Sequence, residues 1–462
     1  MEKKEFEKYT YITKENENYI RKLANYCQSS PHKPKFHITP PCGLLNDPNG
    51  LAYYNGKYHI FYQWHPFDTS HGMKHWGHFI SEDLVIYQHS NEILIPTEEY
   101  EKNGCYSGNS IQIGENLFLY YTANYKSSNG KVPKQAVAFM TPDGKIQKYK
   151  NNPIIDKKPC GLTGEIRDPF VFLRDGKYYM LLGGGTIEGQ GRILLYQSLD
   201  ALKWDYKGTI SLGELELGYM FECPGIIRVD NKDVLFLSLM GVQTKGEKYQ
   251  NEFSSVYFVG QLDVDNMKFE VEYYDELDKG FDFYAPQPFY DKKGQPIYFA
   301  WFGCGTQKLP YMNTDMWIHG ITMPRVLSIQ NGKLLQTLYP SVADQFETIQ
   351  LNNKKAIPVN KNFHLKVNVT KENIQSIHIG EQQDHFDIII EKENNLLRID
   401  RSGLKQRFCC EYGEQRIFSI DLKKPLQLDL YYDNTFVELF VNKGEKVATF
   451  RAFPSVLKIY VE

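Results

Sequence analysis

Three short stretches of this sequence place a carboxylic acid just before a proline. The acids and their prolines are Asp47 and Pro48, Asp168 and Pro169, and Glu222 and Pro224. Cleavage of a glycosidic bond requires two carboxyl groups at a fixed separation, one acting as a general acid and the other as a nucleophile or base. The three stretches therefore predict a sugar hydrolase whose acids come from distant parts of the chain.

Glu222 differs from the two aspartates in its neighbours. Met220 and Phe221 precede it and Ile226 and Ile227 follow it, so burial is expected to disfavour its ionised form. A carboxyl group that keeps its proton suits a general acid. Taken alone, the two aspartate stretches also fit an ordinary turn or an ion pair at a strand edge.

Further motifs accompany the three acids in a recognisable order. They are Phe36-His37, Gly43–Gly50, Phe61–Pro66, His75–His78, Tyr106–Gly108, Arg167–Pro169, Glu222–Pro224, Asp282–Gln287 and Met323–Arg325. This order resembles glycoside hydrolase family 32, which contains invertases, sucrose-6-phosphate hydrolases, levanases and inulinases. The resemblance covers nearly the whole chain after residue 35, and within the family it is greatest to the intracellular sucrose-6-phosphate hydrolases.

The resemblance implies a role for each acid. Asp47 corresponds to the nucleophile that attacks the anomeric carbon of a β-linked fructosyl unit, and Glu222 to the acid/base that protonates the leaving oxygen and then activates water. Asp168, together with Arg167, corresponds to the stabiliser of the transition state. This double displacement retains configuration, so the carboxyl groups of Asp47 and Glu222 are expected roughly 5–5.5 Å apart.

The resemblance also implies the residues that bind the sugar. Asn46, Gln63 and Ser107 match positions that contact the sugar, and Tyr106 and Trp301 match aromatic walls of the pocket. No cofactor and no metal ion are expected.

A second element, residues 71–74, resembles the intracellular sucrose-6-phosphate hydrolases. It implies that Lys74, with His71, binds a phosphorylated glucosyl unit near the mouth of the pocket, whereas the alternative is a solvated loop. His71, His75 and His78 would share a face only on a helix, and this segment is expected to be loop and strand, so no zinc site is predicted.

An internal repeat predicts the elements that position these residues. A hairpin turn followed by an apolar strand occurs at residues 55–62, again at 175–182 and more loosely at 231–237. A second half of the repeat, at 81–87, returns at 198–204. About five such units fit between residues 36 and 335, which predicts a five-bladed β-propeller in which distant motifs meet at the centre.

Different patterns flank the repeats. Thr13 to about Cys27 has helical spacing with Thr13 as the cap, and residues 341–349 suggest a connecting helix. Short strands are then expected near Phe363–Val369, Phe386–Ile390, Leu396–Ile399, Ile417–Ile420, Leu426–Tyr432, Phe436–Val441 and Leu457–Val461, as in a β-sandwich. The predicted division of this all-β chain is a helical extension (1–35), the propeller (36–338), a linker (339–349) and the sandwich (350–462).

Composition limits the partners. The formal net charge is −3 and the basic and acidic residues nearly balance, so a nucleic-acid or anionic-membrane partner is not expected. The charged start of the chain lacks the apolar run of a signal peptide, which predicts a cytoplasmic protein. The eight cysteines lack metal or disulfide spacing. The expected partner is a small sugar, and the oligomeric state stays open.

Several functions remain compatible with the sequence. A fructan hydrolase or a fructosyltransferase would use the same three acids and differ in the loops that hold the acceptor. A noncatalytic sugar-binding propeller would be expected to lack one of the acids. An inverting glycosidase would hold its two carboxyl groups roughly 6.5–9.5 Å apart.

Overall fold

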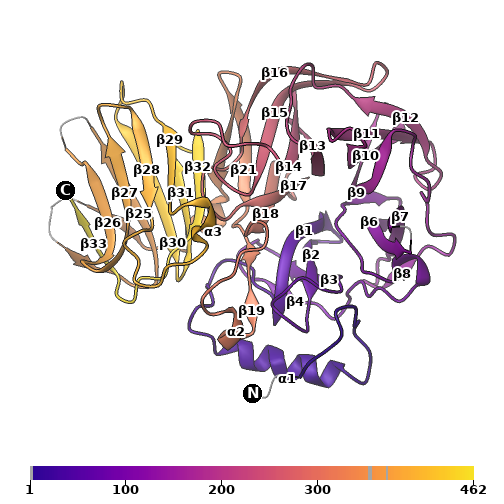
Figure 1. The fold of residues 1–462 in the computed structure, drawn as a ribbon, viewed down its shortest axis with the longest axis horizontal. Coiled ribbons are helices and arrows are strands. Elements are labelled where there is room, and N and C mark those ends of the chain that lie inside the picture. The colour runs from indigo at the N-terminus through magenta and orange to yellow at the C-terminus, as the bar shows by residue number, and fades with distance from the viewer. Residues whose placement is uncertain (1–3, 129, 352–355, 371–372) are drawn as a thin grey trace.

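A computed structural model describes residues 4–128, 130–351, 356–370 and 373–462 (Figure 1). The fold is all-β. Within these residues, positions 43–338 form five sheets of four or five strands. Their strands are β1 (Gly43–Tyr54), β2 (Lys57–His65), β3 (His75–Ser81), β4 (Gln88–His89); β5 (Ser110–Ile113), β6 (Asn116–Ser127), β7 (Gly130–Met140), β8 (Ile146–Lys148); β9 (Leu162–Arg174), β10 (Lys177–Thr186), β11 (Gly191–Ser198), β12 (Asp205–Ile210); β13 (Met220–Val229), β14 (Lys232–Met240), β15 (Phe253–Asp263), β16 (Lys268–Glu276); and β17 (Tyr284–Tyr290), β18 (Pro296–Phe302), β20 (Gly320–Ile321), β21 (Arg325–Gln330), β22 (Lys333–Leu338).

Successive sheets share hydrophobic clusters between their faces. The clusters include Phe61 with Leu119, Val137 with Met180, Leu181 with Leu235, and Phe236 with Tyr298. A strand that is covered on both faces needs apolar residues at consecutive positions, as in residues 234–237 of β14. The apolar runs of the sequence therefore reflect sheets stacked against one another.

The first and fifth sheets are joined directly. Strand β19 (Trp317–Ile318), which follows β18 in the chain, pairs in parallel with β1 at Gly43 and Leu44. Ile321 of β20 bridges to Ile38, just before the first sheet. These two pairings connect the fifth sheet of this region to the first.

The internal repeat is confirmed at atomic detail in one turn. Ser81 Oγ accepts a hydrogen bond from the backbone N–H of Leu84 at 2.9 Å, and Ser198 Oγ accepts one from Ala201 at 2.8 Å. Leu84 and Ala201 both have left-handed backbone, with φ of 63° and 61°. The same local sequence pattern therefore builds the same turn in the first and third sheets.

The C-terminal part of the chain forms two sheets beside the five (Figure 1). One contains β23 (Thr348–Gln350), β25 (Asn362–Val369), β30 (Leu426–Asp433), β31 (Phe436–Val441) and β32 (Lys446–Arg451). The other contains β24 (Ile357–Pro358), β33 (Lys458–Val461), β26 (Ser376–Glu381), β27 (Asp384–Glu391), β28 (Leu396–Asp400) and β29 (Gln415–Ser419). All seven strands expected from the sequence are present, and β23, β24, β26 and β32 are additional.

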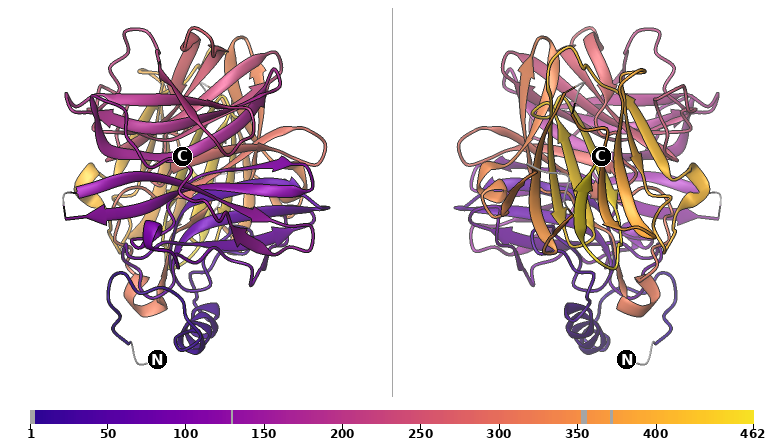
Figure 2. Two further views of the ribbon diagram at one scale, coloured as in Figure 1. Left: turned by 90° about the vertical axis from the view of Figure 1, so that its right-hand side faces the viewer. Right: turned by 90° about the vertical axis from the view of Figure 1, so that its left-hand side faces the viewer.

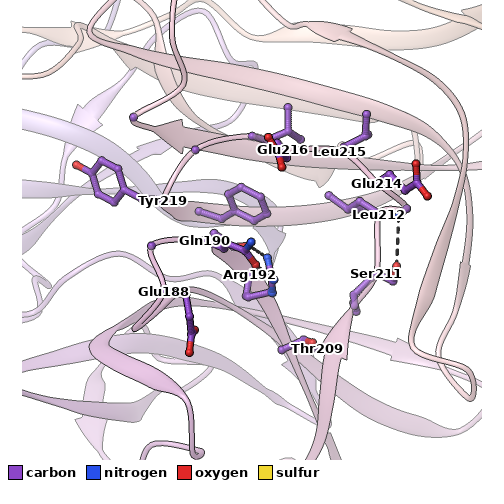
Figure 3. Close-up of a pocket in the computed structure, with 18 residues that line it drawn as sticks. Glu188, Gln190, Arg192, Thr209, Ser211, Leu212, Glu214, Leu215, Glu216 and Tyr219 are labelled. Atoms are coloured by element: carbon purple, nitrogen blue, oxygen red, sulfur yellow. Dashed lines mark hydrogen bonds between the residues drawn. The ribbon is translucent and has the colours of Figure 1, made fainter.

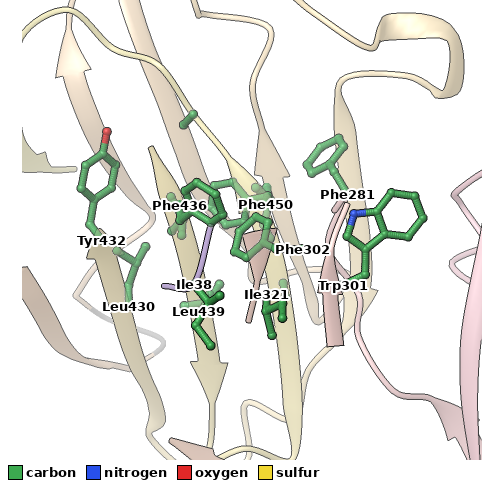
Figure 4. Packing of buried hydrophobic residues seen from close by; sticks show 14 of the residues in the cluster. Ile38, Phe281, Trp301, Phe302, Ile321, Leu430, Tyr432, Phe436, Leu439 and Phe450 are labelled. Atoms are coloured by element: carbon green, nitrogen blue, oxygen red, sulfur yellow. The ribbon is translucent and has the colours of Figure 1, made fainter. Parts of the chain in front are cut away.

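A buried apolar cluster connects the two parts (Figure 4). It includes Ile38, Phe302 and Ile321 from the N-terminal part and Phe436 and Phe450 from the C-terminal sheets. Phe302 packs edge-to-face against Phe436 at this junction, with ring centroids 4.4 Å apart.

A buried ionic network lies beside that cluster. Arg325 of β21 pairs with Asp278 at 3.0 Å and with Glu438 of β31 at 2.7 Å, and all three side chains are fully buried. His37 bridges Glu438 and Asp433 at 3.0 and 2.8 Å. The two carboxylates beside Arg325 raise the pKa of its guanidinium, so this cation stays charged inside the junction.

The helices differ in part from the sequence prediction. Helix α1 (Glu17–Gln28) has Asn16 as its cap residue, and the Asn16 side chain accepts a hydrogen bond from the Thr13 N–H at 2.9 Å. The prediction that Thr13 caps the helix is therefore wrong, because the chain first turns at residues 13–16. Figure 2 shows α1 at the edge of the molecule, outside the sheets.

The connecting helix expected at residues 341–349 is a single turn, α3 (Pro340–Ala343), and β23 follows it. The remaining helices are α2 (Met312–Asp315) and two 3-10 turns, Glu99–Glu101 and Cys410–Tyr412. In the described part of the chain, no helix has the length and apolar character needed to cross a lipid bilayer.

Candidate active site

The three acids lie at equivalent places in three sheets. Asp47 is in β1, Asp168 in β9 and Glu222 in β13, and at each acid the pairing with the next strand shifts register. A proline cannot donate a hydrogen bond to the neighbouring strand, so it marks an interruption of the ladder, and such a bulge redirects the adjacent side chain. The acid-proline motifs are therefore the bulges that turn the acids toward a common centre.

Backbone conformation marks the same places. Asp168 and Cys223, which each precede a proline, have φ values of 63° and 46°, and Ala285 before Pro286 in β17 has 49°. Left-handed backbone is uncommon for residues other than glycine and costs of order 1–3 kcal/mol. Three strands thus hold strained backbone where they meet at the centre.

Asp47 is surrounded by hydrogen-bond donors. The Ser107 hydroxyl and the Gln63 amide, the latter at 3.3 Å, donate to Asp47 Oδ2. The Asn46 amide donates to Oδ1 at 3.1 Å and to Gln63 at 2.9 Å. These donors hold the carboxylate in one orientation, as a nucleophile requires.

Lys74 lies beneath this group and not at the mouth of the pocket. Lys74 is only 2% exposed, and its ammonium donates a hydrogen bond to Asn46 Oδ1 at 2.7 Å. Burial lowers its pKa to about 7, which the charge of Asp47 partly opposes. The solvated-loop alternative is therefore wrong for Lys74, whereas His71 three residues earlier is exposed.

Glu222 has polar partners on both oxygens. Arg167 Nε donates to Oε1 at 2.9 Å, and the Tyr284 hydroxyl donates to Oε2 at 2.7 Å. The apolar surroundings expected from the sequence are incorrect, because residues distant in sequence provide its environment. The apolar neighbours Phe221 and Ile226 instead face the cluster between the third and fourth sheets.

Asp168 is buried close to the other two acids. It is 5% exposed, and its Oδ2 accepts a hydrogen bond from the Cys223 N–H at 2.9 Å. Burial raises its pKa to about 7, with smaller increases from Glu222 and Asp47 and a decrease from Arg167. Burial and Glu222 also raise the pKa of Asp47, against the hydrogen bond from Ser107. The charge of Glu222 therefore acts on both aspartates and disfavours their ionised forms.

Tyr106 and Trp301, the two aromatic residues expected in the pocket wall, lie in different parts of the fold, and their contact with the sugar stays a prediction. The backbone carbonyl of Tyr106 accepts a hydrogen bond from Trp76 Nε1 at 2.9 Å, and burial raises the pKa of its phenol to about 12. Trp301 is 4% exposed and its ring lies 6.3 Å from that of Tyr284. The Trp301 ring therefore packs beside Tyr284, which in turn donates a hydrogen bond to Glu222.

Two histidines of the 71–78 segment, His75 and His78, make hydrogen bonds within the fold. His75 Nε2 is 3.1 Å from the Ile12 N–H, and His78 contacts His59 at 3.0 Å and the Glu92 carbonyl at 2.9 Å. Both are buried and serve the packing of the first sheet.

Two family models match nearly the whole chain. Residues 37–338 match the glycosyl hydrolases family 32 N-terminal domain and residues 333–461 match the family 32 C-terminal domain. The chain belongs to glycosyl hydrolase family 32. The resemblance inferred from the motifs is thereby confirmed.

Individual relatives of this family 32 chain are similar over most of their length. The sucrose-6-phosphate hydrolase of Staphylococcus xylosus is 34% identical over 94% of this chain and 90% of the relative, and that of Bacillus subtilis is 33% identical over 94% and 92%. The solved sucrose-6-phosphate hydrolase of Lactobacillus gasseri has a TM-score of 0.90 at 30% identity, covering 99% of this chain and 97% of that one. A Bombyx mori β-fructofuranosidase mutant in complex with sucrose has a TM-score of 0.85 at 27% identity, covering 97% and 94%.

Three residues of the candidate site were given no role from the sequence. They are Thr122, Cys223 and Tyr284. The Thr122 hydroxyl accepts a hydrogen bond from the Asp168 N–H at 2.8 Å. Cys223 Sγ lies 3.8 Å from the Asp47 carboxylate and 3.6 Å from the Asp168 carboxylate. For Cys223 and Tyr284 a signal existed, because both belong to stretches that end in a proline. Thr122 carries no such signal.

A groove of about 820 Å³ lies beside the strand that carries Glu222 (Figure 3). Its lining includes the exposed Tyr219 and the carboxylates of Glu188, Glu214 and Glu216, with Arg192 as a basic member. An excess of carboxylates does not favour a phosphate group. The groove is therefore not where a phosphate group is expected to bind.

Proposed function

We propose that this chain is a retaining β-fructofuranosidase that hydrolyses the β-fructofuranosidic bond of sucrose 6-phosphate. The observation that carries the reaction type is the meeting of Asp47, Asp168 and Glu222 from three sheets, each in a proline bulge. The substrate is supported by the relatives, several of which are named sucrose-6-phosphate hydrolases at 30–34% identity.

In the proposed mechanism, Asp47 attacks the anomeric carbon while Glu222 protonates the leaving oxygen. The donors from Ser107, Gln63 and Asn46 orient the nucleophile. Asp168 and Arg167 hydrogen-bond fructose hydroxyls as positive charge develops on the ring. Glu222 then removes a proton from water, which releases fructose with its configuration retained.

The proposed architecture is a five-bladed β-propeller (36–338), a linker (339–349) and a β-sandwich (350–462), after the N-terminal extension (1–35). The join between β19 and β1 supports closure of a ring, because it links the last sheet to the first. We place the enzyme in the cytoplasm, where sucrose phosphorylated during uptake would reach it.

The role proposed for Lys74 follows its burial. Its ammonium positions the Asn46 amide, so Lys74→Met is expected to reduce kcat/KM for sucrose and for sucrose 6-phosphate by the same factor. His71, which is exposed and has its ring 6.4 Å from that of Trp301, is the member of the 71–74 element available to a phosphate. A loss confined to sucrose 6-phosphate in the Lys74 variant would instead assign Lys74 to the phosphate.

The deciding experiment compares kcat/KM of the purified protein on sucrose 6-phosphate, sucrose and inulin. The proposal expects the highest value on sucrose 6-phosphate and retention of configuration in the first fructose released, as followed by NMR. Asp47→Ala and Glu222→Gln should each lower kcat by several orders of magnitude with an unchanged fold. Preferred hydrolysis of inulin would favour a fructan hydrolase that uses the groove of Figure 3, and inversion would refute the assigned roles.

A further inference from the structure

Two histidines and an aspartate meet on the solvent side of the six-stranded C-terminal sheet. His378 of β26 is directly opposite Asp387 of β27, and His385 lies two residues before Asp387 on the same face. Residues 386, 388 and 390 on the opposite face are buried in the core. The three polar side chains are 15%, 20% and 16% exposed, so an ion can reach them.

The ligating atoms of this cluster are already close. His378 Nδ1 is 2.7 Å from Asp387 Oδ1, and His385 Nε2 is 3.4 Å from Asp387 Oδ2. One nitrogen or oxygen from each residue lies within 4.8 Å of the others. Ligands at about 2.0–2.1 Å from a tetrahedral Zn²⁺ ion lie roughly 3.3–3.4 Å apart, so small side-chain movements complete the geometry.

The hydrogen bonding of His385 favours a cation at this position. Its Nδ1 is 3.0 Å from the backbone carbonyl of Glu381, and a carbonyl only accepts hydrogen bonds, so the proton of the neutral ring is on Nδ1. The Nε2 lone pair then faces the Asp387 carboxylate with no proton between them. A proton or a metal ion relieves this repulsion, and a carbonyl on the far nitrogen is the usual partner of a metal-bound histidine.

A second histidine-aspartate pair in the other C-terminal sheet provides an internal comparison. His364 Nε2 is 2.9 Å from Asp429 Oδ1, and the other ring nitrogen contacts a threonine hydroxyl at 3.1 Å. His378 has the corresponding contact with a serine hydroxyl at 2.8 Å. A single histidine-aspartate pair of this kind is an ordinary surface interaction. The cluster of His378, His385 and Asp387 differs because His385 adds a second imidazole.

We propose that His378, His385 and Asp387 bind one divalent transition-metal ion, with Zn²⁺ as the best match. Two imidazole nitrogens and one carboxylate oxygen suit zinc, and water takes the fourth position. The ion joins β26 to β27 on the face opposite the sandwich core. Its effect is on the stability of this sheet, and the proposal does not depend on the reaction that the chain catalyses.

The test starts from protein freed of metal by chelation and dialysis, with its exposed thiols at Cys160 and Cys410 alkylated to prevent binding there. Calorimetric titration with Zn²⁺ is expected to give one ion per chain and a rise in the melting temperature. His385→Ala should abolish both effects while the contact between His378 and Asp387 keeps the fold intact. Co²⁺ in place of Zn²⁺ should give visible d–d absorption without a thiolate charge-transfer band.

The matched control is His364→Ala, which removes an imidazole from the single pair. It should leave the stoichiometry and affinity for Zn²⁺ unchanged. Stoichiometric binding that persists in His385→Ala, an equal loss in His364→Ala, or the absence of Zn²⁺ binding by the alkylated wild-type protein would each overturn the proposal.

Discussion

Replacement of Asp168 by asparagine should stabilise the protein at alkaline pH. Burial raises the pKa of this carboxyl from 3.8 to about 7, so its ionisation opposes folding. The sign follows from linkage: a raised folded-state pKa gives stability below the unfolded-state value, and this stability is lost as pH rises through about 7. Asparagine carries no charge at any pH and still offers an oxygen to the Cys223 N–H.

The size of the effect follows from the same shift. Between pH 5 and pH 7 the folded wild type holds a proton that the unfolded chain has lost, and each pH unit changes the free energy of unfolding by about 1.4 kcal/mol. The advantage of Asp168→Asn should therefore grow by about 2 kcal/mol over these two units, because the folded carboxyl is half ionised at pH 7, and level off near pH 8. With about 2.1 cal/mol/K of unfolding entropy per residue and 462 residues, this equals about 2 °C in melting temperature.

The assay is calorimetric or fluorescence melting of both proteins at pH 5, 6, 7 and 8. Asp156→Asn, at an exposed position, is the matched control and should show no trend with pH. Activity should fall in Asp168→Asn in spite of the added stability. A difference in melting temperature that is the same at every pH would refute the role given to burial of this carboxylate.

Three further outcomes are expected. Tyr284→Phe removes the hydroxyl that donates to Glu222 Oε2 at 2.7 Å, so Glu222 is positioned less well and kcat should fall on the order of 10²-fold; an unchanged kcat would show that this hydrogen bond does not position Glu222. Arg325→Met leaves the buried Asp278 and Glu438 without their cation and should cost about 3–5 kcal/mol in urea unfolding, whereas a neutral result would show that the network is dispensable. Catalytic activity should survive exhaustive EDTA treatment, and restoration of lost activity by one divalent ion would contradict a reaction carried by carboxyl groups alone.

The three candidate acids were recognisable from the sequence because their signal is local. A proline that interrupts a strand and the acid beside it occupy adjacent positions, so Asp47, Asp168 and Glu222 could be found without a structure. The repeated turns at Ser81 and Ser198 are equally local, since each is closed by hydrogen bonds within three residues. The assigned roles of the acids stay predictions.

The surroundings of these residues depended on contacts between distant segments. The sequence around Glu222 is apolar, but Arg167 and Tyr284 contact it from 55 and 62 positions away. Likewise, the sequence near Lys74 does not indicate that its ammonium donates a hydrogen bond to Asn46, 28 positions earlier. The electrostatic environment of a residue depends on the groups within a few ångströms in space, and the adjacent residues in the sequence do not reveal which groups these are.

In the C-terminal sheets, too, some features were predictable from local sequence and others only from the tertiary structure. Alternating apolar residues identified strands such as β27 and β30, whereas β26 alternates only at Ile377 and Ile379 and is held by pairing with β27 and β33. The cluster of His378, His385 and Asp387 has no motif in the sequence, because it arises from register across two strands. Local periodicity and turn chemistry thus determined the all-β class and most of the strands. Only the tertiary structure decided which charges, donors and potential ligands lie together, because the energies that shift a pKa or bind an ion act through space.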